Sequence, residues 1–271
     1  MIIRAGYSIS FHCPVAAPML LQLNVHPSRE ADLVTPDVVR STPNLPMDSY
    51  RDLFGNRVTR VEAPPGQVTF NSDFTIRDSG QPDETPADAP LTPVRDLPSE
   101  VLIFLLASRY CDSDNLSDFA WSQFHGIGGG ANLVQAICDF VHGRIRFDYA
   151  AANPRRTASD GLTEGVGVCR DFAHLAVALC RAMNVPARYC TGYLGDIGVP
   201  PDPAPMDFSA WFEVFLNGRW HSFDARHNTP RIGRIVMAIG RDAADVALTT
   251  AFGNAPLQRF EVTTYEEEMA A

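Results

Sequence analysis

The sequence predicts an α+β protein in which a small β-rich domain precedes a larger domain of helices and antiparallel strands. Residues 1–77 contain short runs of alternating polar and apolar residues, which is the period of a half-buried strand. A segment with almost no apolar residues follows, and from Leu97 onward apolar residues recur at helical spacing. A chain of 271 residues is long enough for two such domains.

The amino-terminal domain is expected to be β-sandwich-like. Its four alternating runs are separated by clusters of Pro and Gly and cover residues 7–12, 20–25, 57–61 and 67–76. Residues 78–93 are rich in Pro, Asp and Gly and cannot bury enough apolar surface to fold by themselves. The predicted domains are therefore 1–93, a β-rich domain with its linker, and 94–271, the core domain.

The core domain is predicted to begin with helices. Val101, Phe104 and Leu105 share one helical face, and residues 131–142 form a second amphipathic run. After a short β-like stretch at 144–149, the Asn-Pro, Ser-Asp-Gly and repeated Gly signals of residues 150–167 predict an irregular loop.

The second half of the core domain is predicted to be a buried helix followed by strands. Apolar residues between 171 and 183 recur at i, i+3, i+4 and i+7, and Asn184 and Pro186 end the helix. The strands that follow are expected at residues 187–193, 209–216 and 219–224.

Charge and composition argue against several classes of partner. The net charge is -10 and the pI is about 5.1 without a basic stripe, so a nucleic acid is not an expected partner. No run approaches the ~20 apolar residues of a membrane span, and the amino terminus lacks a secretion signal, so we expect a cytoplasmic protein. The six cysteines form no C-x-x-C pair and no cluster with histidine, which predicts reduced thiols and neither a metal nor a cofactor. The oligomeric state stays open.

Cys169 is the strongest candidate for a reactive residue. It follows two glycines and opens the predicted helix, where unpaired backbone N–H groups and the helix dipole favour a thiolate. The competing interpretation is that Cys169 is a small buried apolar residue, which is the usual fate of a free cysteine. The sequence alone favours neither.

A predicted hairpin indicates which histidine could lie close enough to Cys169 to act as its base. Asn217 and Gly218 form the signal of a two-residue type I′ turn, and this turn fixes a register in which facing residues sum to 435. The register places Ser209 and Trp211 on the same face as Asp224. His221 faces the opposite way, and His174 points about 140° away from Cys169 around its helix. His227 rejoins the site only if the chain bends after Asp224.

Four runs of residues, in this order and spacing, resemble the transglutaminase-like superfamily, and the β-rich segment ahead of them is similar to the amino-terminal region of its bacterial members. The runs are TASDGLTEGVGVCRDFAH from Thr157, VPARYCTGY from Val185, AWFEV from Ala210 and WHSFD from Trp220. The resemblance implies a papain-like α+β core with Cys169 as nucleophile, a histidine just before Ala-Trp as base, and Asp224 orienting that base. It also implies acyl transfer through a thioester, to water or to an amine.

The sequence departs from this pattern at the expected base, where Ser209 replaces histidine. A hydroxyl cannot usefully accept the thiol proton near pH 7. Two hypotheses follow. In one, His227 serves as base in a cysteine-dependent peptidase, amidase or acyltransferase, and Trp211 and Tyr149 contact its peptide or amide substrate. In the other, the domain has no catalytic activity and binds a peptide or a partner protein in the cleft that corresponds to the active site of the family.

Overall fold

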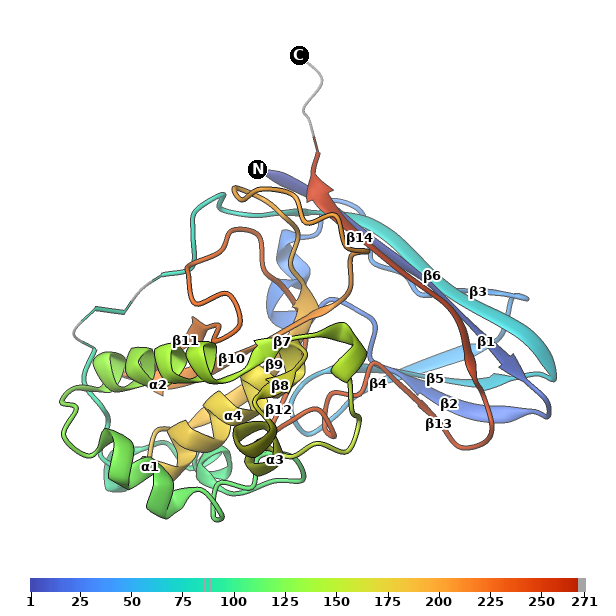
Figure 1. The fold of residues 1–271 in the computed structure, drawn as a ribbon. Helices are drawn as coiled ribbons and strands as arrows, with labels where there is room; N and C mark the ends of the chain where they lie inside the picture. The colour runs from blue at the N-terminus through green and yellow to red at the C-terminus, as the bar shows by residue number, and fades with distance from the viewer. Residues whose placement is uncertain (85, 88, 268–271) are drawn as a thin grey trace.

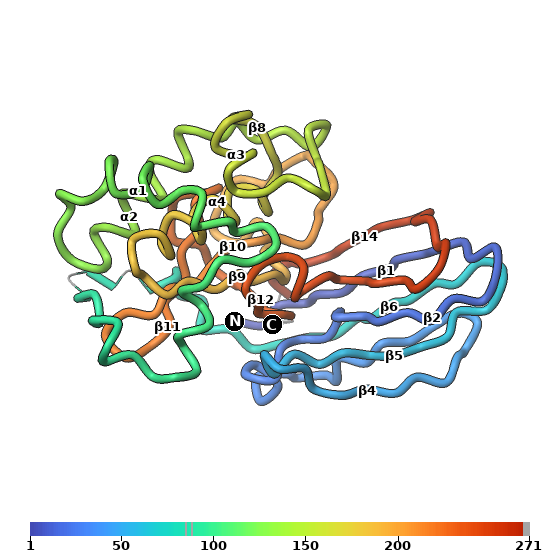
Figure 2. The backbone as a smooth tube through the Cα atoms, turned by 90° about the horizontal axis from the view of Figure 1, so that it is seen from below, coloured from blue at the N-terminus to red at the C-terminus, as the bar shows by residue number. Residues whose placement is uncertain are grey.

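The computed structural model describes residues 1–84, 86–87 and 89–267 and shows a β-sandwich beside an α+β core (Figure 1). One sheet of the sandwich has the strand order β14-β1-β6-β3, and the other has the order β13-β2-β5-β4. Figure 2 shows the strands of the sandwich lying together on one side of the molecule, with the helices on the other. The predicted fold class, α+β with a β-sandwich-like amino-terminal part, is confirmed.

The strands of the sandwich follow the alternation of the sequence. In β6 (Gly66–Arg77) every second side chain from Val68 to Ile76 is buried, because alternate residues face the space between the sheets. The other strands are β1 (Ile2–Cys13), β2 (Ala17–Leu21), β3 (Arg40–Thr42), β4 (Met47–Arg51), β5 (Arg57–Ala63), β13 (Thr249–Ala251) and β14 (Leu257–Glu266).

The carboxyl-terminal strands correct the predicted domain boundary. β14 pairs along nearly the whole of β1, and β13 pairs with β2. Residues 249–266 therefore belong to the sandwich, although the prediction assigned them to the core domain. Their pairing partners lie more than 200 residues earlier in the chain, and a local pattern cannot reveal such a pairing.

The core domain contains an antiparallel sheet of order β11-β10-β9-β12, with helices packed against it. Its strands are β9 (Ala187–Tyr193), β10 (Ser209–Leu216), β11 (Arg219–Phe223) and β12 (Ile235–Gly240). Its α-helices are α1 (Ser117–Phe124), α2 (Gly130–Arg144), α3 (Ala158–Glu164) and α4 (Cys169–Ala182). Two residues each form β7 (Arg146–Phe147) and β8 (Val166–Gly167), which pair in parallel.

Helix α4 lies at the centre of this domain. It contacts β9 and β10 on one side and α1, α2 and α3 on the other, so every residue from Asp171 to Ala182 is buried. The sequence pattern predicted this helix and its end, where Asn184 adopts a positive φ of 61°. Of the helices that cover its second face, α1 and α2 come from more distant parts of the chain, whereas α3 directly precedes α4.

Two local predictions need correction. The run after Leu97 forms a short 3₁₀ helix, η3 (Ser99–Leu105), and not an α-helix; a second 3₁₀ helix, η2 (Val94–Asp96), precedes Leu97. The predicted loop 150–167 contains η4 (Tyr149–Ala151) and helix α3. Thr157 and Asp160 form a capping box that starts α3, and Gly165 ends it with a φ of 65°. The glycines that suggested a loop include the one that ends this helix.

Candidate active site

Cys169 is the first residue of α4, as the sequence predicted, and a charged network holds this end of the helix. The carboxylate of Asp171 accepts a hydrogen bond from the N–H of Val168 at 2.9 Å and another from the guanidinium of Arg156 at 3.0 Å. Gly167 precedes this turn, and a Cβ at this position would lie 2.5 Å from the Asp171 carboxylate. The second glycine of the motif is therefore needed for close approach.

The hairpin that leads to Asp224 has the predicted register. Leu216 pairs with Arg219 and Phe212 with Phe223, and the turn residues Asn217 and Gly218 have φ values of 48° and 80°. Strand β11 ends at Phe223, so the pairing expected between Trp211 and Asp224 does not form. Asp224 instead begins a turn.

The chain bends directly after Asp224. This bend is the condition under which His227 was expected to rejoin the site. The carboxylate of Asp224 accepts hydrogen bonds from the N–H groups of Arg226 at 2.9 Å and His227 at 3.1 Å. The imidazole of His142 bonds the carbonyl oxygens of Ala225 and Arg226 from α2 and holds the turn from outside. The local cap thus returns His227 toward the core sheet.

Asp224 orients His227 and is itself held by Arg234. Nδ1 of His227 lies 2.8 Å from Oδ2 of Asp224, and the guanidinium of Arg234 donates to the same oxygen at 3.0 Å. Arg234 also donates to Asp83 of the linker at 2.8 Å. Although burial raises the pKa of Asp224, these bonds together hold it well below its usual range. The carboxylate is ionised, and the bond to Nδ1 leaves Nε2 of His227 for chemistry.

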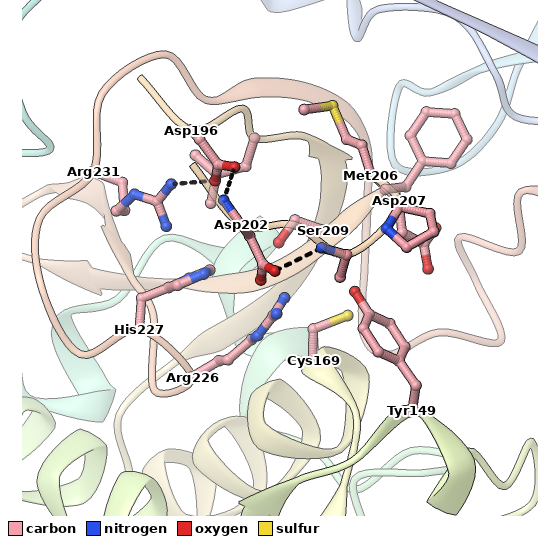
Figure 3. Close-up of a pocket in the computed structure, with 14 residues that line it drawn as sticks. Tyr149, Cys169, Asp196, Asp202, Met206, Asp207, Ser209, Arg226, His227 and Arg231 are labelled. Carbon is pink, nitrogen blue, oxygen red and sulfur yellow. Dashed lines mark hydrogen bonds and ion pairs between the residues drawn. The ribbon is translucent and has the colours of Figure 1, made fainter. Parts of the chain in front are cut away.

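His227 and Cys169 line one cavity of about 90 Å³, which we call the His227 pocket. Figure 3 shows the imidazole of His227 and the guanidinium of Arg226 pointing from the turn toward Cys169, with the guanidinium nearer to the sulfur. Arg226 stacks over the ring of Phe147 at 3.9 Å. Among the described residues, no hydrogen bond joins the sulfur of Cys169 to an imidazole. The two groups therefore share a pocket without touching.

The expected low pKa of the Cys169 thiol is wrong for this structure. Burial raises the pKa to about 11, and this effect outweighs the opposing influences of the Arg226 charge and of backbone groups of Ala210 and Arg170 that hydrogen-bond the sulfur. The helix start acts in the predicted direction but does not dominate. The resting thiol is protonated at neutral pH, so a nucleophilic reaction requires a base.

The other predicted site residues separate into two groups. Tyr149 lines the His227 pocket with its hydroxyl directed toward the sulfur of Cys169 (Figure 3), and Ser209 lines the pocket from the start of β10. The Ser209 hydroxyl is buried without a hydrogen-bond partner among the described residues. Trp211 is only 2% exposed and lines neither cavity beside Cys169. The structure does not bring Trp211 to the pocket, because its ring packs under Arg234 at 5.1 Å.

Two further histidines lie outside the pocket, as expected. His221 faces Val214 in the hairpin and is buried. His174 stacks on Tyr110 at 5.2 Å, and Nε2 accepts a hydrogen bond from the N–H of Ala243 at 3.1 Å. Burial holds the pKa of His174 well below its usual range, so this imidazole is neutral.

A second and larger cavity of about 490 Å³ borders Cys169, and we call it the Tyr189 pocket. Cys169, Asp207, Phe208 and Ser209 line both pockets, so the sulfur lies at their junction. Apolar atoms contribute most of the wall of the Tyr189 pocket, whereas polar atoms contribute most of the wall of the His227 pocket. Cys169 therefore lies between a small, mostly polar pocket and a larger, mostly apolar pocket.

Sequence reasoning missed Arg226 as a pocket residue and Arg234 as the partner of Asp224. Arg226 lies between Asp224 and His227 in the sequence, so the bend that returns His227 necessarily returns Arg226 as well. Arg234 is only 8% exposed. Its buried position depends on Asp83 and Trp211, which come from two other segments of the chain.

Within residues 1–84, 86–87 and 89–267, no three His, Cys, Asp or Glu side chains are grouped so as to hold a metal ion. No helix in the same ranges has the length and apolar character needed to cross a membrane. The cytoplasmic location stays a prediction.

Comparison with known proteins identifies the core. Residues 122–225 match the family model described as the transglutaminase-like superfamily. The whole chain superposes with a TM-score of 0.86 and 29% identity on 92% of a crystal structure from Cytophaga hutchinsonii, whose protein is named as a candidate cysteine protease.

Curated relatives match a shorter segment. An uncharacterized protein of Mycobacterium leprae is 30% identical over 109 residues, which are 38% of this chain and 39% of that protein. An uncharacterized protein of Mycobacterium tuberculosis is 34% identical over 127 residues, 42% of this chain and 40% of that protein. The matched segments thus span about two fifths of these relatives. From the family match and the fold together, residues 122–225 resemble the core of the transglutaminase-like superfamily.

Proposed function

We propose that this protein is a cysteine-dependent hydrolase or acyltransferase that acts on peptide or amide bonds. The observation that carries the proposal is the His227–Asp224 pair, whose 2.8 Å bond orients an imidazole into the pocket that Cys169 lines at the start of α4. The pair supplies a base at a place where Ser209 cannot. The likeness to the Cytophaga protein supports the same class of reaction.

The proposed reaction has two stages. The sulfur of Cys169 attacks the amide carbonyl carbon, the thiol proton passes through His227 to the departing nitrogen, and the C–N bond breaks as the thioester forms. Water or an amine then attacks the thioester, gives up a proton to His227, and restores the thiol. Because the sulfur and the imidazole do not touch, a bound water bridges them in the first stage.

The thioester provides the direct test. Incubation with a p-nitrophenyl ester of an N-acyl amino acid, followed by acid quenching, should give an acyl adduct that peptide mapping places on Cys169. The Cys138→Ala variant is the control, since this cysteine is buried in α2 away from the pocket. An unmodified Cys169 in protein quenched while the ester is still being turned over, or an adduct spread over several cysteines, would count against the nucleophile.

Restoring the missing histidine should raise activity. In the Ser209→His variant a second imidazole enters the pocket beside Cys169, because residue 209 lines both cavities at the sulfur. We expect kcat/KM for amide cleavage to rise by about 10-fold or more, within the range that a positioned base contributes. The Ser222→His variant on the neighbouring strand β11 is the control, since residue 222 lines neither pocket beside Cys169. A lower rate with an unchanged melting temperature would show that His227 already fills the role.

Two observations favour a second function. The thiol pKa of about 11 and the missing contact with an imidazole describe a resting site that does not form a thiolate–imidazolium pair. A peptide-binding domain without catalysis would have this site. In that case Cys169→Ala retains peptide affinity, and wild-type protein shows neither an acyl adduct nor turnover.

A further inference from the structure

The wall of the His227 pocket carries two arginines that the proposed reaction leaves unexplained. Arg226 forms no ion pair with a carboxylate in residues 1–84, 86–87 and 89–267, although its guanidinium lies beside the sulfur (Figure 3). Arg231 has a side chain only 6% exposed, and its Nε is buried without a hydrogen-bond partner in the same ranges. Arg226 is half-buried, and the buried Nε of Arg231 is unfavourable unless a ligand satisfies it.

Both arginines are held in place by their surroundings. Arg226 stacks on Phe147, and its backbone N–H is fixed by Asp224. Arg231 donates to the carbonyl of Gly195 at 3.0 Å and lies 3.7 Å from Asp196. The guanidinium groups therefore need little reordering to bind an anion, and a planar carboxylate matches the geometry of their donors.

Arg226 and Arg231 line the same pocket beside Cys169 as His227. The part of the substrate that enters this pocket, either the acyl group or the leaving amine, is therefore the part that the two arginines contact. The group that gives a proton to the departing amine must lie on the leaving-group side of the sulfur. His227 lines the pocket that Arg226 and Arg231 line and does not line the Tyr189 pocket. The leaving amine thus occupies the His227 pocket, and the acyl part of the substrate occupies the Tyr189 pocket.

Size and polarity sharpen the assignment. The His227 pocket has about 90 Å³, room for one small residue, whereas the Tyr189 pocket has about 490 Å³. Tyr189, Ala210 and Val246 give the larger pocket an apolar wall that suits an apolar side chain. Asp196, Asp202 and Asp207 also line the smaller pocket and disfavour an acidic side chain on the leaving residue.

We propose that the enzyme removes a single carboxyl-terminal residue from peptides, with the free α-carboxylate of the leaving amino acid bound by Arg226 and Arg231. This inference rests on the proposed function. The peptide C–N bond breaks, water supplies OH to the shortened peptide and H to the amine, and the products are a peptide with an apolar last residue and one free amino acid.

The test compares N-acetyl-Phe-Ala with its carboxyl-terminal amide, which differs only in lacking the charged carboxylate. Wild-type protein should release free alanine from the acid with a kcat/KM about 10- to 100-fold above that for loss of alaninamide from the amide, the effect expected of charge-assisted hydrogen bonds. In Arg226→Gln the ratio of acid to amide should fall toward 1 whatever the absolute rates are. Arg95→Gln is the matched control, because this arginine is 85% exposed and far from the pocket, and its ratio should equal that of wild type.

A binding measurement separates this inference from the proposed function. In the Cys169→Ala protein, calorimetry should show the peptide acid binding at least about 10-fold more tightly than the amide, with the preference lost on adding Arg226→Gln. Equal kcat/KM for acid and amide in wild type would overturn the inference and leave the hydrolase standing. If neither peptide is cleaved, the hydrolase fails on these substrates, and equal affinities in Cys169→Ala then overturn carboxylate recognition as well.

Discussion

Cys169→Ala is expected to lower kcat/KM for amide cleavage by about 10⁴-fold or more. The thioester cannot form without the sulfur, and the remaining groups of the pocket contribute only binding and electrostatic stabilisation. Cys169 is partly exposed at the first turn of α4, so the change in the free energy of unfolding should stay below about 1 kcal/mol. Activity and stability are therefore expected to separate at this residue.

The measurement is steady-state cleavage of N-acetyl-Phe-Ala by the wild type and the variant, with urea unfolding followed in parallel. Cys138→Ala is again the control: it removes a sulfur from the core, where 1% of the residue is exposed, and should change stability more than activity. Residual cleavage within about 10-fold of wild type would show that the reaction does not pass through Cys169.

Asp224→Asn is expected to damage both stability and catalysis. Asp224 is 7% exposed, and its carboxylate accepts four hydrogen bonds, two from backbone N–H groups and one each from the side chains of His227 and Arg234. The side-chain nitrogen of asparagine cannot accept a hydrogen bond, so one of these buried donors loses its partner. In one orientation of the amide, that donor is the charged Arg234. We expect the free energy of unfolding to fall by about 3–5 kcal/mol. The rate should fall by roughly 10²- to 10⁴-fold, because the tautomer and position of His227 are no longer fixed.

The pKa of Asp224 also predicts how the loss of stability in Asp224→Asn changes with pH. The pKa of Asp224 is held well below its usual range by His227 and Arg234, so its folded value is lower than its unfolded value near ~3.9. A depressed carboxyl pKa contributes stability that is fully present above the unfolded pKa and is lost as the pH falls toward the folded value. The stability difference between wild type and Asp224→Asn should therefore be constant from about pH 5 to 7 and shrink below about pH 4.

Urea unfolding at a series of pH values measures this difference. The control is Asp48→Asn, which breaks a surface pair with Arg60 whose side chains are 70% and 64% exposed, and which should cost no more than about 1 kcal/mol. If Asp224→Asn fails to fold, Arg234→Gln tests the same network, since it removes one donor to Asp224 while the bond from His227 remains. A difference for Asp224→Asn that grows as the pH falls would contradict the assignment.

The local sequence pattern predicted those strands, turns and helices that depend on interactions between nearby residues. Strands β9 and β10 begin and end where alternation and turn residues predicted, and the Asn-Gly turn set the register of β10 and β11. Helix α4 followed its apolar spacing. Helix α3 was missed because its glycines suggested a loop, whereas Gly165 in fact ends the helix. Strands β13 and β14 could not be placed because their partners are far away in the sequence.

The sequence by itself determined the position of Cys169 at a helix start, the loss of the usual histidine at Ser209, and the bend that His227 would need, because each depends on residues within one or two turns of chain. The tertiary structure decided the rest. Burial among distant segments raised the pKa of the thiol against the influence of the helix start. Packing across three segments placed Arg234 on Asp224. The fold also brought Arg231 into the pocket beside Arg226, a placement that depends on contacts between segments and that no local pattern could indicate.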